Sequence, residues 1–194
     1  DTILSLAAVA QNSAAPAGST AGNTVVSLLG GMSDVDASAV QGMAITGVNA
    51  NGKLWYSTDG GTTWTENTTA LSAGNALLLT ANANNRVYFA PNTGFEGIVN
   101  DALSFRAWDQ ISGTQGSFVS TTSNGTTTAF STFIETVSQS VGRTLTIDTV
   151  SVDNLVAINE AIQLTGTAAA GASVSLNING TTRSVTADGT TGNW

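Results

Sequence analysis

Short stretches in which apolar and polar residues alternate recur along the chain, and this pattern sets the strongest limit on its fold. In one of them Leu103, Phe105 and Ala107 would face one side of an extended strand and the intervening residues the other. Similar segments lie at residues 2–10, 25–29, 44–48, 54–56, 63–65, 77–80, 86–90 and 133–141. Clusters of Gly, Asn, Asp and Ser separate them, and helical periodicity does not persist. We therefore predict an all-β fold, an antiparallel β-sandwich, in which residues 112–128 form a long loop or loose hairpin.

The alternation changes near Gly142–Asp148, and this change divides the chain into two predicted domains. Residues 1–147 hold the segments described above, whereas residues 148–194 show a cleaner meander around an Asn179-Gly180 turn. About 47 residues are too few to close a two-sheet sandwich. The second domain is therefore predicted to be incomplete: either the chain is a fragment of a longer protein, or a neighbour supplies the missing strands.

The charge composition excludes several classes of function. The chain has 5 Lys and Arg residues against 13 Asp and Glu, a formal net charge of -8, and neither His nor Cys. Without His or Cys there is no Ser–His triad, thiolate nucleophile, ordinary zinc site or disulfide. So few cations argue against nucleic-acid binding, and no apolar run approaches the roughly 18 residues of a membrane span. Residues 2–10 lack a basic start and are interpreted as a strand rather than a signal peptide.

The most specific local motif is Ser57-Thr58-Asp59-Gly60-Gly61-Thr62-Thr63-Trp64. It matches the Asp-box pattern S-x-D-x-G-x-T-W, which occurs in the hairpins of sialidase propeller blades. In such a turn the carboxylate caps backbone N–H groups and Gly permits positive φ. A sialidase needs several boxes, an arginine cluster and a Tyr nucleophile, but this chain has one box and four arginines. We interpret the motif as a structural hairpin.

Acidic residues gather at a few places in this weakly charged chain. Asp34 and Asp36 follow one strand segment, whereas Asp101 and Asp109 bracket the segment 103–108. Eight residues of strand separate the last two by about 26 Å, so only one of them could share an ion with Asp34 and Asp36. Oxygen ligands from loops are what Ca²⁺ prefers. The alternative is that Asp34 and Asp36 cap turns while Asp101 and Asp109 are solvated charges.

A further group of oxygen ligands lies at the predicted domain junction and consists of Asp148, Asp153, Asn154 and Glu160. An ion bound there would remove hinge freedom between the domains. A polar linker without an ion explains the same residues.

Three stretches of the sequence resemble repeat modules of very large bacterial (RTX-type) surface adhesins. Residues 29–36, Leu-Gly-Gly-Met-Ser-Asp-Val-Asp, look like the opening of their cadherin-like domains. Residues 86–97 followed by 101–109 look like the closing signature of the same domains, in which an aromatic strand ends in Asp. Residues 162–194, which end in Gly192-Asn193-Trp194, are similar to their bacterial Ig-like repeats.

This resemblance implies a cadherin-like β-sandwich at 1–147 and an incomplete bacterial Ig-like module at 148–194. It implies a non-enzymatic extender of an extracellular adhesin on the bacterial cell surface, whose partners are neighbouring repeat modules and also cell-surface glycans or other copies. The metal ligands that it implies for Ca²⁺ are Asp34, Asp36, Asp101, Asp109, Asp153 and Glu160. Gln11-Asn12-Ser13 stand where family members often carry acidic residues, so the resemblance does not extend to an ion at the N-terminal joint.

Three other functions remain open at this point. A carbohydrate-binding module would use Trp55, Tyr56, Trp64 and Trp108 as an aromatic platform. A subunit of a surface filament or S-layer would complete its second domain by strand donation between copies. A glycosidase would need two carboxylates about 5–9 Å apart, and Glu66 with Asp59 or Glu96 with Asp101 are the pairs whose sequence spacing permits this.

Overall fold

The computed structural model describes residues 4–30, 41–142, 146–147, 164–178 and 181–194. The chain divides into two units, Asp1–Val141 and Gly142–Trp194. The division falls at the start of the stretch where the sequence pattern changes. Each unit is nearly all β, and the helix among the described residues, α1 (Val25–Leu28), has four residues.

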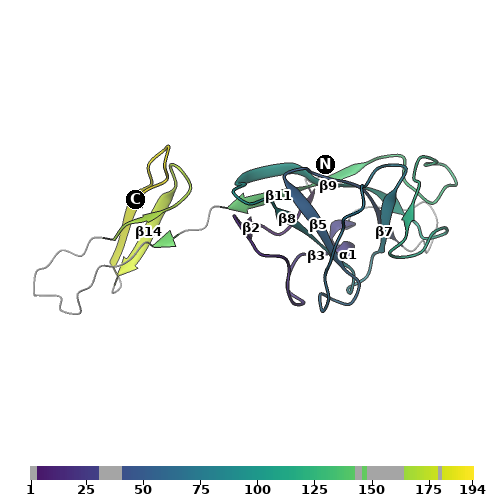
Figure 1. The fold of residues 1–194 in the computed structure, drawn as a ribbon, viewed down its shortest axis with the longest axis horizontal. Helices are drawn as coiled ribbons and strands as arrows, with labels where there is room; N and C mark the ends of the chain where they lie inside the picture. Colours follow the sequence, from purple (N-terminus) through teal and green to yellow (C-terminus); the bar gives the residue numbers. More distant parts are fainter. Residues whose placement is uncertain (1–3, 31–40, 143–145, 148–163, 179–180) are drawn as a thin grey trace, which may run out of the picture. The chain divides into compact units, whose positions relative to one another are not determined.

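The first unit contains a larger sheet of seven strands (Figure 1). Its order is β1 (Leu4–Ser5), β11 (Glu135–Gly142), β9 (Gly97–Trp108), β4 (Gly42–Val48), β7 (Ala76–Thr80) and β10 (Phe118–Val119), with β2 (Val9–Ala10) also paired to β11. The pairings from β11 through β9, β4 and β7 to β10 are antiparallel. In contrast, β1 runs parallel to β11, with Leu4 opposite Val137.

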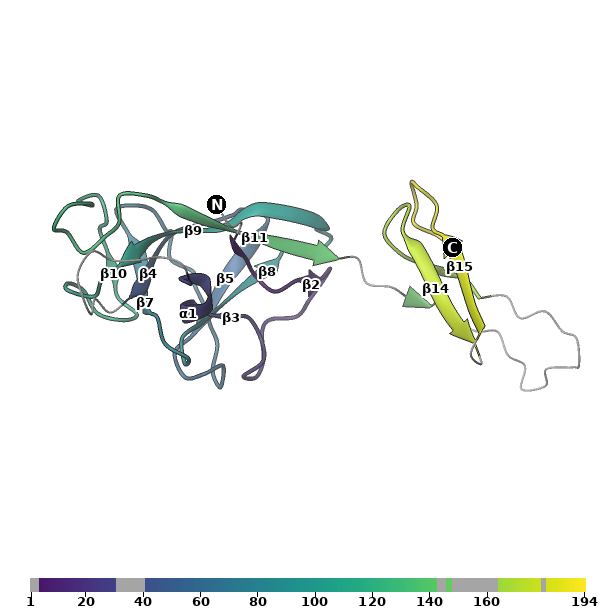
Figure 2. The ribbon, with the colours of Figure 1, turned by 180° about the vertical axis from the view of Figure 1, so that it is seen from behind.

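A smaller antiparallel sheet of four strands forms the second layer of this unit (Figures 1 and 2). Its order is β3 (Asn23–Thr24), β8 (Arg86–Pro91), β5 (Gly52–Ser57) and β6 (Thr65–Glu66). In β5 and β6, Trp55 lies opposite Glu66 and Tyr56 opposite Thr65. The hairpin predicted around Asp59 is thus confirmed.

The two sheets enclose one apolar core. The core residues of the larger sheet include Met43, Ile45, Leu77, Leu79, Leu103, Phe105 and Val137, and those of the smaller sheet include Leu54, Val87 and Phe89. Because successive strand residues point to opposite faces, these alternate positions are the inward faces of the two layers. The structure is therefore all-β with antiparallel sheets, consistent with the predicted β-sandwich.

The loop that follows β9 covers the outer face of the larger sheet. Ala44, Leu78 and Trp108 point away from the main core and pack with Ala129 and Phe130. Arg106, on the same face and almost fully buried, donates from Nη1 to the carbonyl oxygens of residues 131 and 132, at 2.8 and 2.5 Å. The predicted loop at 112–128 contributes Val119, which packs against the same cluster, and its one short strand is β10.

Three of the predicted strands are wrong in detail. Of residues 63–65, only Thr65 lies in a strand, which is β6. Residues 25–29 form α1 and its C-terminal cap instead of a strand. The β-branched pair Val25-Val26 suggested a strand, but Val25, Leu28 and Leu29 are the buried residues, which is the spacing of one helix face. Residues 2–10 give the two short strands β1 and β2 rather than one continuous strand.

The second unit contains β12 (Thr146–Ile147) paired with β13 (Gly166–Thr167), and β14 (Ser173–Ile178) paired with β15 (Thr181–Thr186). The predicted hairpin of β14 and β15 is confirmed, and its Asn179-Gly180 turn lies outside the described residues. Trp194 exchanges two backbone hydrogen bonds with Gly166, at 2.9 and 3.0 Å, and packs against Ala168 and Val174. Thr167 and Asn193 form an isolated β-bridge beside this contact.

We expect Phe105→Ala to destabilise the first unit by about 3–5 kcal/mol, because it leaves a cavity between the sheets where a fully buried ring (0% exposed) stood. The matched control is Phe133→Ala, whose ring is 76% exposed and should change stability by no more than about 0.5 kcal/mol. Urea unfolding followed by near-UV circular dichroism measures both. Equal effects of the two variants would contradict the placement of the core.

Candidate functional site

Of the six predicted metal ligands, Asp101 and Asp109 lie in the described part of the chain. Asp34, Asp36, Asp153 and Glu160 lie outside it. The strand that carries Asp101 begins at Gly97, so this residue lies within β9 and not before its start as predicted.

Asp101 occupies an irregularity in the pairing of β9 with β11. Leu103 pairs with Val137 and Val99 pairs with Gln139, so the three residues of β9 between these pairs oppose one residue of β11. Asp101 Oδ1 accepts a hydrogen bond from Asn49 Nδ2 at 2.6 Å. The carboxylate thereby ties the irregular part of β9 to the turn that follows β4.

Asp109 stands directly after β9 and closes a local turn. Its Oδ1 accepts a hydrogen bond from the backbone N–H of Ile111 at 2.9 Å. Since one extended strand separates Asp109 from Asp101, the two carboxylates cannot share an ion. Among the described residues no three acidic side chains gather where they could hold a metal. A site that combines one of these two aspartates with Asp34 and Asp36 stays a prediction, because Asp34 and Asp36 lie outside the described residues.

The Asp59 turn is closed by the protein's own donors. Asp59 accepts hydrogen bonds from the backbone N–H of Thr63 at 2.9 Å, the Thr63 hydroxyl at 2.6 Å and the Ser57 hydroxyl at 2.8 Å. These bonds, that of the Thr63 hydroxyl above all, lower the pKa of Asp59 from 3.8 to about 2. Gly61 has φ 91°, and a Cβ there would lie 2.7 Å from the carbonyl oxygen of Gly18. The motif is a structural turn, as the sequence predicts.

A second turn in the other unit uses the same chemistry. Asp188 accepts hydrogen bonds from the backbone N–H groups of Thr191 at 2.7 Å and Thr190 at 3.0 Å, and from the Thr191 hydroxyl at 2.9 Å. The Thr191 N–H, followed by the Thr190 N–H, holds the pKa of Asp188 below its ordinary value. Each of the two aspartates closes a turn that lies a few residues before a tryptophan in the sequence.

The four aromatic residues considered for a sugar platform do not share one surface. Trp108 is only 2% exposed and donates from Nε1 to the Ser112 carbonyl oxygen at 2.7 Å. Tyr56 packs toward the main core. Trp55, between the inward-facing residues of β5, points outward and pairs across the strands with Tyr88. Trp64 meets Tyr88 edge-on, with ring centroids 6.3 Å apart.

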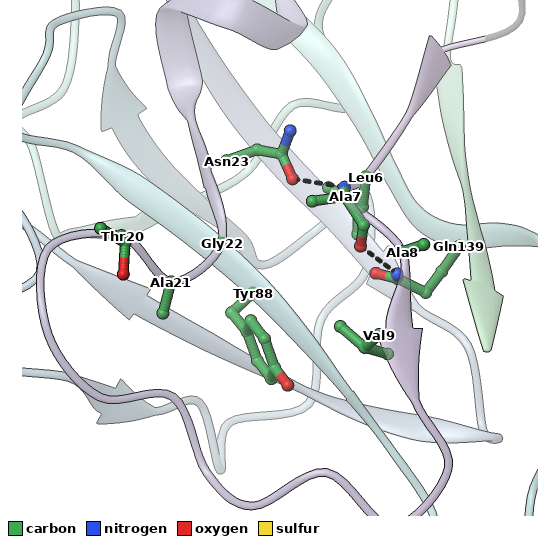
Figure 3. A pocket seen from close by; sticks show the side chains of 10 residues that line it. All are labelled: Leu6, Ala7, Ala8, Val9, Thr20, Ala21, Gly22, Asn23, Tyr88 and Gln139. Atoms are coloured by element: carbon green, nitrogen blue, oxygen red, sulfur yellow. Dashed lines mark hydrogen bonds between the residues drawn. The ribbon is translucent and has the colours of Figure 1, made fainter. Parts of the chain in front are cut away.

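A pocket of about 190 Å³ opens beside Tyr88, at the rim where the two sheets meet the N-terminal segment (Figure 3). Its lining residues are Leu6, Ala7, Ala8, Val9, Thr20, Ala21, Gly22, Asn23, Tyr88 and Gln139. Gln139 is 1% exposed and donates from Nε2 to the Ala7 carbonyl oxygen at 2.5 Å. The Ala7 N–H in turn donates to Asn23 Oδ1 at 2.8 Å. These bonds connect β11 through the N-terminal segment to β3.

Sequence reasoning did not single out the pocket residues. A signal exists for Gln139, because it falls between Val137 and Val141 on the face of β11 that is otherwise apolar. A polar side chain at a core position is a deviation that calls for a structural or functional reason. No sequence signal connects Gln139 with Ala7 or Tyr88, which are far apart in the chain.

Comparison of the chain with known protein families, with curated proteins and with solved structures gives no match. None of the described helices is long and apolar enough to cross a membrane.

We expect Asp59→Asn to destabilise the first unit near neutral pH, because the amide replaces an ionised acceptor of three hydrogen bonds. Since the folded pKa is lowered, this stabilisation is present above pH 3.8 and is lost as the pH falls toward about 2. The stability difference between wild type and variant should therefore shrink over that window.

Thermal unfolding at a series of pH values in EDTA measures this difference. Asp109→Asn, which alters an acceptor of one described backbone hydrogen bond, is the matched control. A difference between wild type and Asp59→Asn that stays constant down to pH 2 would contradict the assigned role.

Proposed function

We propose that this chain is a structural extender of a multi-domain extracellular protein on a bacterial cell surface, with no catalytic role of its own. The proposal is supported by the hydrogen bonds that the described aspartates accept. Asp59, Asp101, Asp109 and Asp188 all accept hydrogen bonds from neighbouring parts of their own fold. Such side chains fix turn geometry, whereas catalytic carboxylates need access to a substrate.

The low density of charged residues agrees with this role. Charged residues make up 9% of the chain, so like-charge repulsion between successive modules would be small. Solubility would then come from exposed hydroxyl and amide groups. An extender is built from compact units that follow one another along the chain, and this chain contains two such β units.

Calcium is the second part of the proposal. Asp34 and Asp36 would supply ligands for one ion, and Asp153 and Glu160 would supply ligands for another. Ca²⁺ takes about six to eight oxygen ligands, so backbone carbonyls, amide oxygens and water would complete each site. Because an ion that binds only the folded state stabilises it, calcium would raise the unfolding midpoint.

We expect the thermal midpoint in millimolar CaCl₂ to exceed that in EDTA, and the combined variant Asp34→Asn/Asp36→Asn to lose most of the difference between the two conditions. The variant Asp153→Asn/Glu160→Gln should reduce the remainder. Differential scanning calorimetry of the full chain measures the shifts.

Asp59→Asn serves as the control, since its carboxylate is engaged in a turn and the calcium shift should persist. MgCl₂ at the same concentration tests for a general ionic-strength effect. An identical thermal midpoint in calcium and EDTA would contradict the calcium part of the proposal. The extender role is tested separately by force spectroscopy.

The extender role predicts resistance to force. When the full chain is stretched from its two ends, the first unit should unfold in one discrete event. The event should release a length on the order of 400–500 Å, because about 141 residues extend by at most roughly 3.5 Å each. Single-molecule force spectroscopy records it, and gradual lengthening without a discrete event would contradict a load-bearing role.

A further inference from the structure

We propose that the pocket beside Tyr88 binds the acetamido group of a neutral N-acetylated amino sugar. The inference does not depend on the extender role, since it uses only the lining of the first unit. It assigns to this unit a binding function in addition to a structural one.

The walls of the pocket are held in place from both sheets. The Gln139 carboxamide projects from β11, and the Tyr88 ring lies across from it on β8 (Figure 3). Arg86 donates from Nε to the Ala21 carbonyl oxygen at 2.8 Å and from Nη2 to the Gly22 carbonyl oxygen at 2.9 Å. The wall formed by residues 20–23 is thus fixed before any ligand arrives, which lowers the entropic cost of binding.

The size and charge of the pocket limit its ligand. Its volume of about 190 Å³ is below the roughly 300–1,000 Å³ of sites for drug-sized molecules, so it suits a substituent or a single ring. No Asp, Glu, Lys or Arg lines it. A charged ligand would lose its hydration without gaining a counter-charge, so the ligand must be neutral.

The orientation of Gln139 determines the polar contact. The Ala7 carbonyl oxygen requires a donor, so the Gln139 amide nitrogen faces it, and Nε2 also lies 3.3 Å from the Ser140 carbonyl oxygen. Among the described residues Oε1 accepts no hydrogen bond, and it lies on the pocket side of the carboxamide (Figure 3), while Gln139 as a whole is 1% exposed. A ligand that brings an N–H or O–H donor would satisfy this oxygen.

The apolar part of the lining specifies what must accompany the donor. Leu6, Val9 and Ala21 supply methyl groups to the lining, with Val9 beside the Gln139 carboxamide and Ala21 across the pocket from it (Figure 3). An acetamido group combines one N–H donor with one methyl group, so it can bond to Oε1 while its methyl group packs against these side chains.

The aromatic residues favour a sugar over a peptide as the carrier of this group. Trp55 is half-buried and stands opposite Tyr88 on the same outer face of the smaller sheet. A pyranose ring has a face of C–H groups that packs on aromatic rings. Tyr88 is 9% exposed, so with the acetamido group inserted the sugar ring would meet only the accessible part of Tyr88 and extend toward the half-buried Trp55. An acetylated peptide has no matching ring.

The test is a titration of the full, ¹⁵N-labelled chain with N-acetylglucosamine, followed by NMR. We expect saturable shifts of the Gln139 side-chain amide and of the backbone amides of Ala7, Ala21 and Asn23. Amides of β14 and β15 should not move. Glucose, which lacks the acetamido group, should bind at least tenfold more weakly.

Two variants that obstruct the pocket sharpen the test. Ala21→Leu fills it without changing the backbone bonds of residue 21, and Thr20→Trp covers its entrance at an exposed residue that makes no described hydrogen bond. Both should weaken N-acetylglucosamine binding at least tenfold. Ala70→Leu, at an exposed turn outside the pocket, should bind as wild type does. An unchanged thermal midpoint verifies that each variant is folded.

Three results would overturn the proposal. One is the absence of saturable shifts with N-acetylglucosamine, and another is equal binding of glucose. The third is unchanged binding by a folded pocket variant. If N-acetylalanine methylamide bound as tightly as N-acetylglucosamine, the pocket would belong to an acetylated peptide and the assignment to a sugar would be wrong.

Discussion

Burial of two apolar sheet faces against each other is the interaction on which the first unit depends. Phe105 from the larger sheet and Phe89 from the smaller one lie in the same core with no exposed surface. Only alternate residues of a strand can contribute to such a core, so the side chains between them are free to serve other purposes. On one side they pack under the loop after β9, and on the other they bring Trp55 and Tyr88 to the outer face.

A chain with so few charges closes its turns with hydroxyl, amide and carboxylate groups. Asp59 and Asp188 each gather donors from a threonine a few residues further along. Asp101 performs a related task over a longer distance, since Asn49 is its donor. The bonds of Asp59 and Asp188 are local and cost little conformational entropy, because the donor and the acceptor lie close together in the chain. They explain how long connecting segments stay ordered without disulfides.

The sequence predicts the parts of this fold that local pattern decides. The hairpin of β5 and β6 and the hairpin of β14 and β15 follow from alternation and turn residues next to each other in the chain. The helix α1 is not predicted, because the adjacent β-branched residues Val25 and Val26 favour a strand. The place of Asp101 inside an irregular part of β9 depends on the register of β11, which no local pattern encodes. The pocket depends on residues that only the fold brings together, such as Ala7 and Gln139, which are 132 positions apart.

The parallel pairing of β1 with β11 has a mechanical consequence. These strands are the first and the last of the unit, and further bonds from Leu6 to Ser138 and from Gln139 to Ala7 continue their connection. Tension on the two ends of the unit would slide parallel strands lengthwise past each other. All hydrogen bonds between the two strands then share the load and must break nearly together. In an antiparallel terminal pair, the same tension would break the hydrogen bonds one after another.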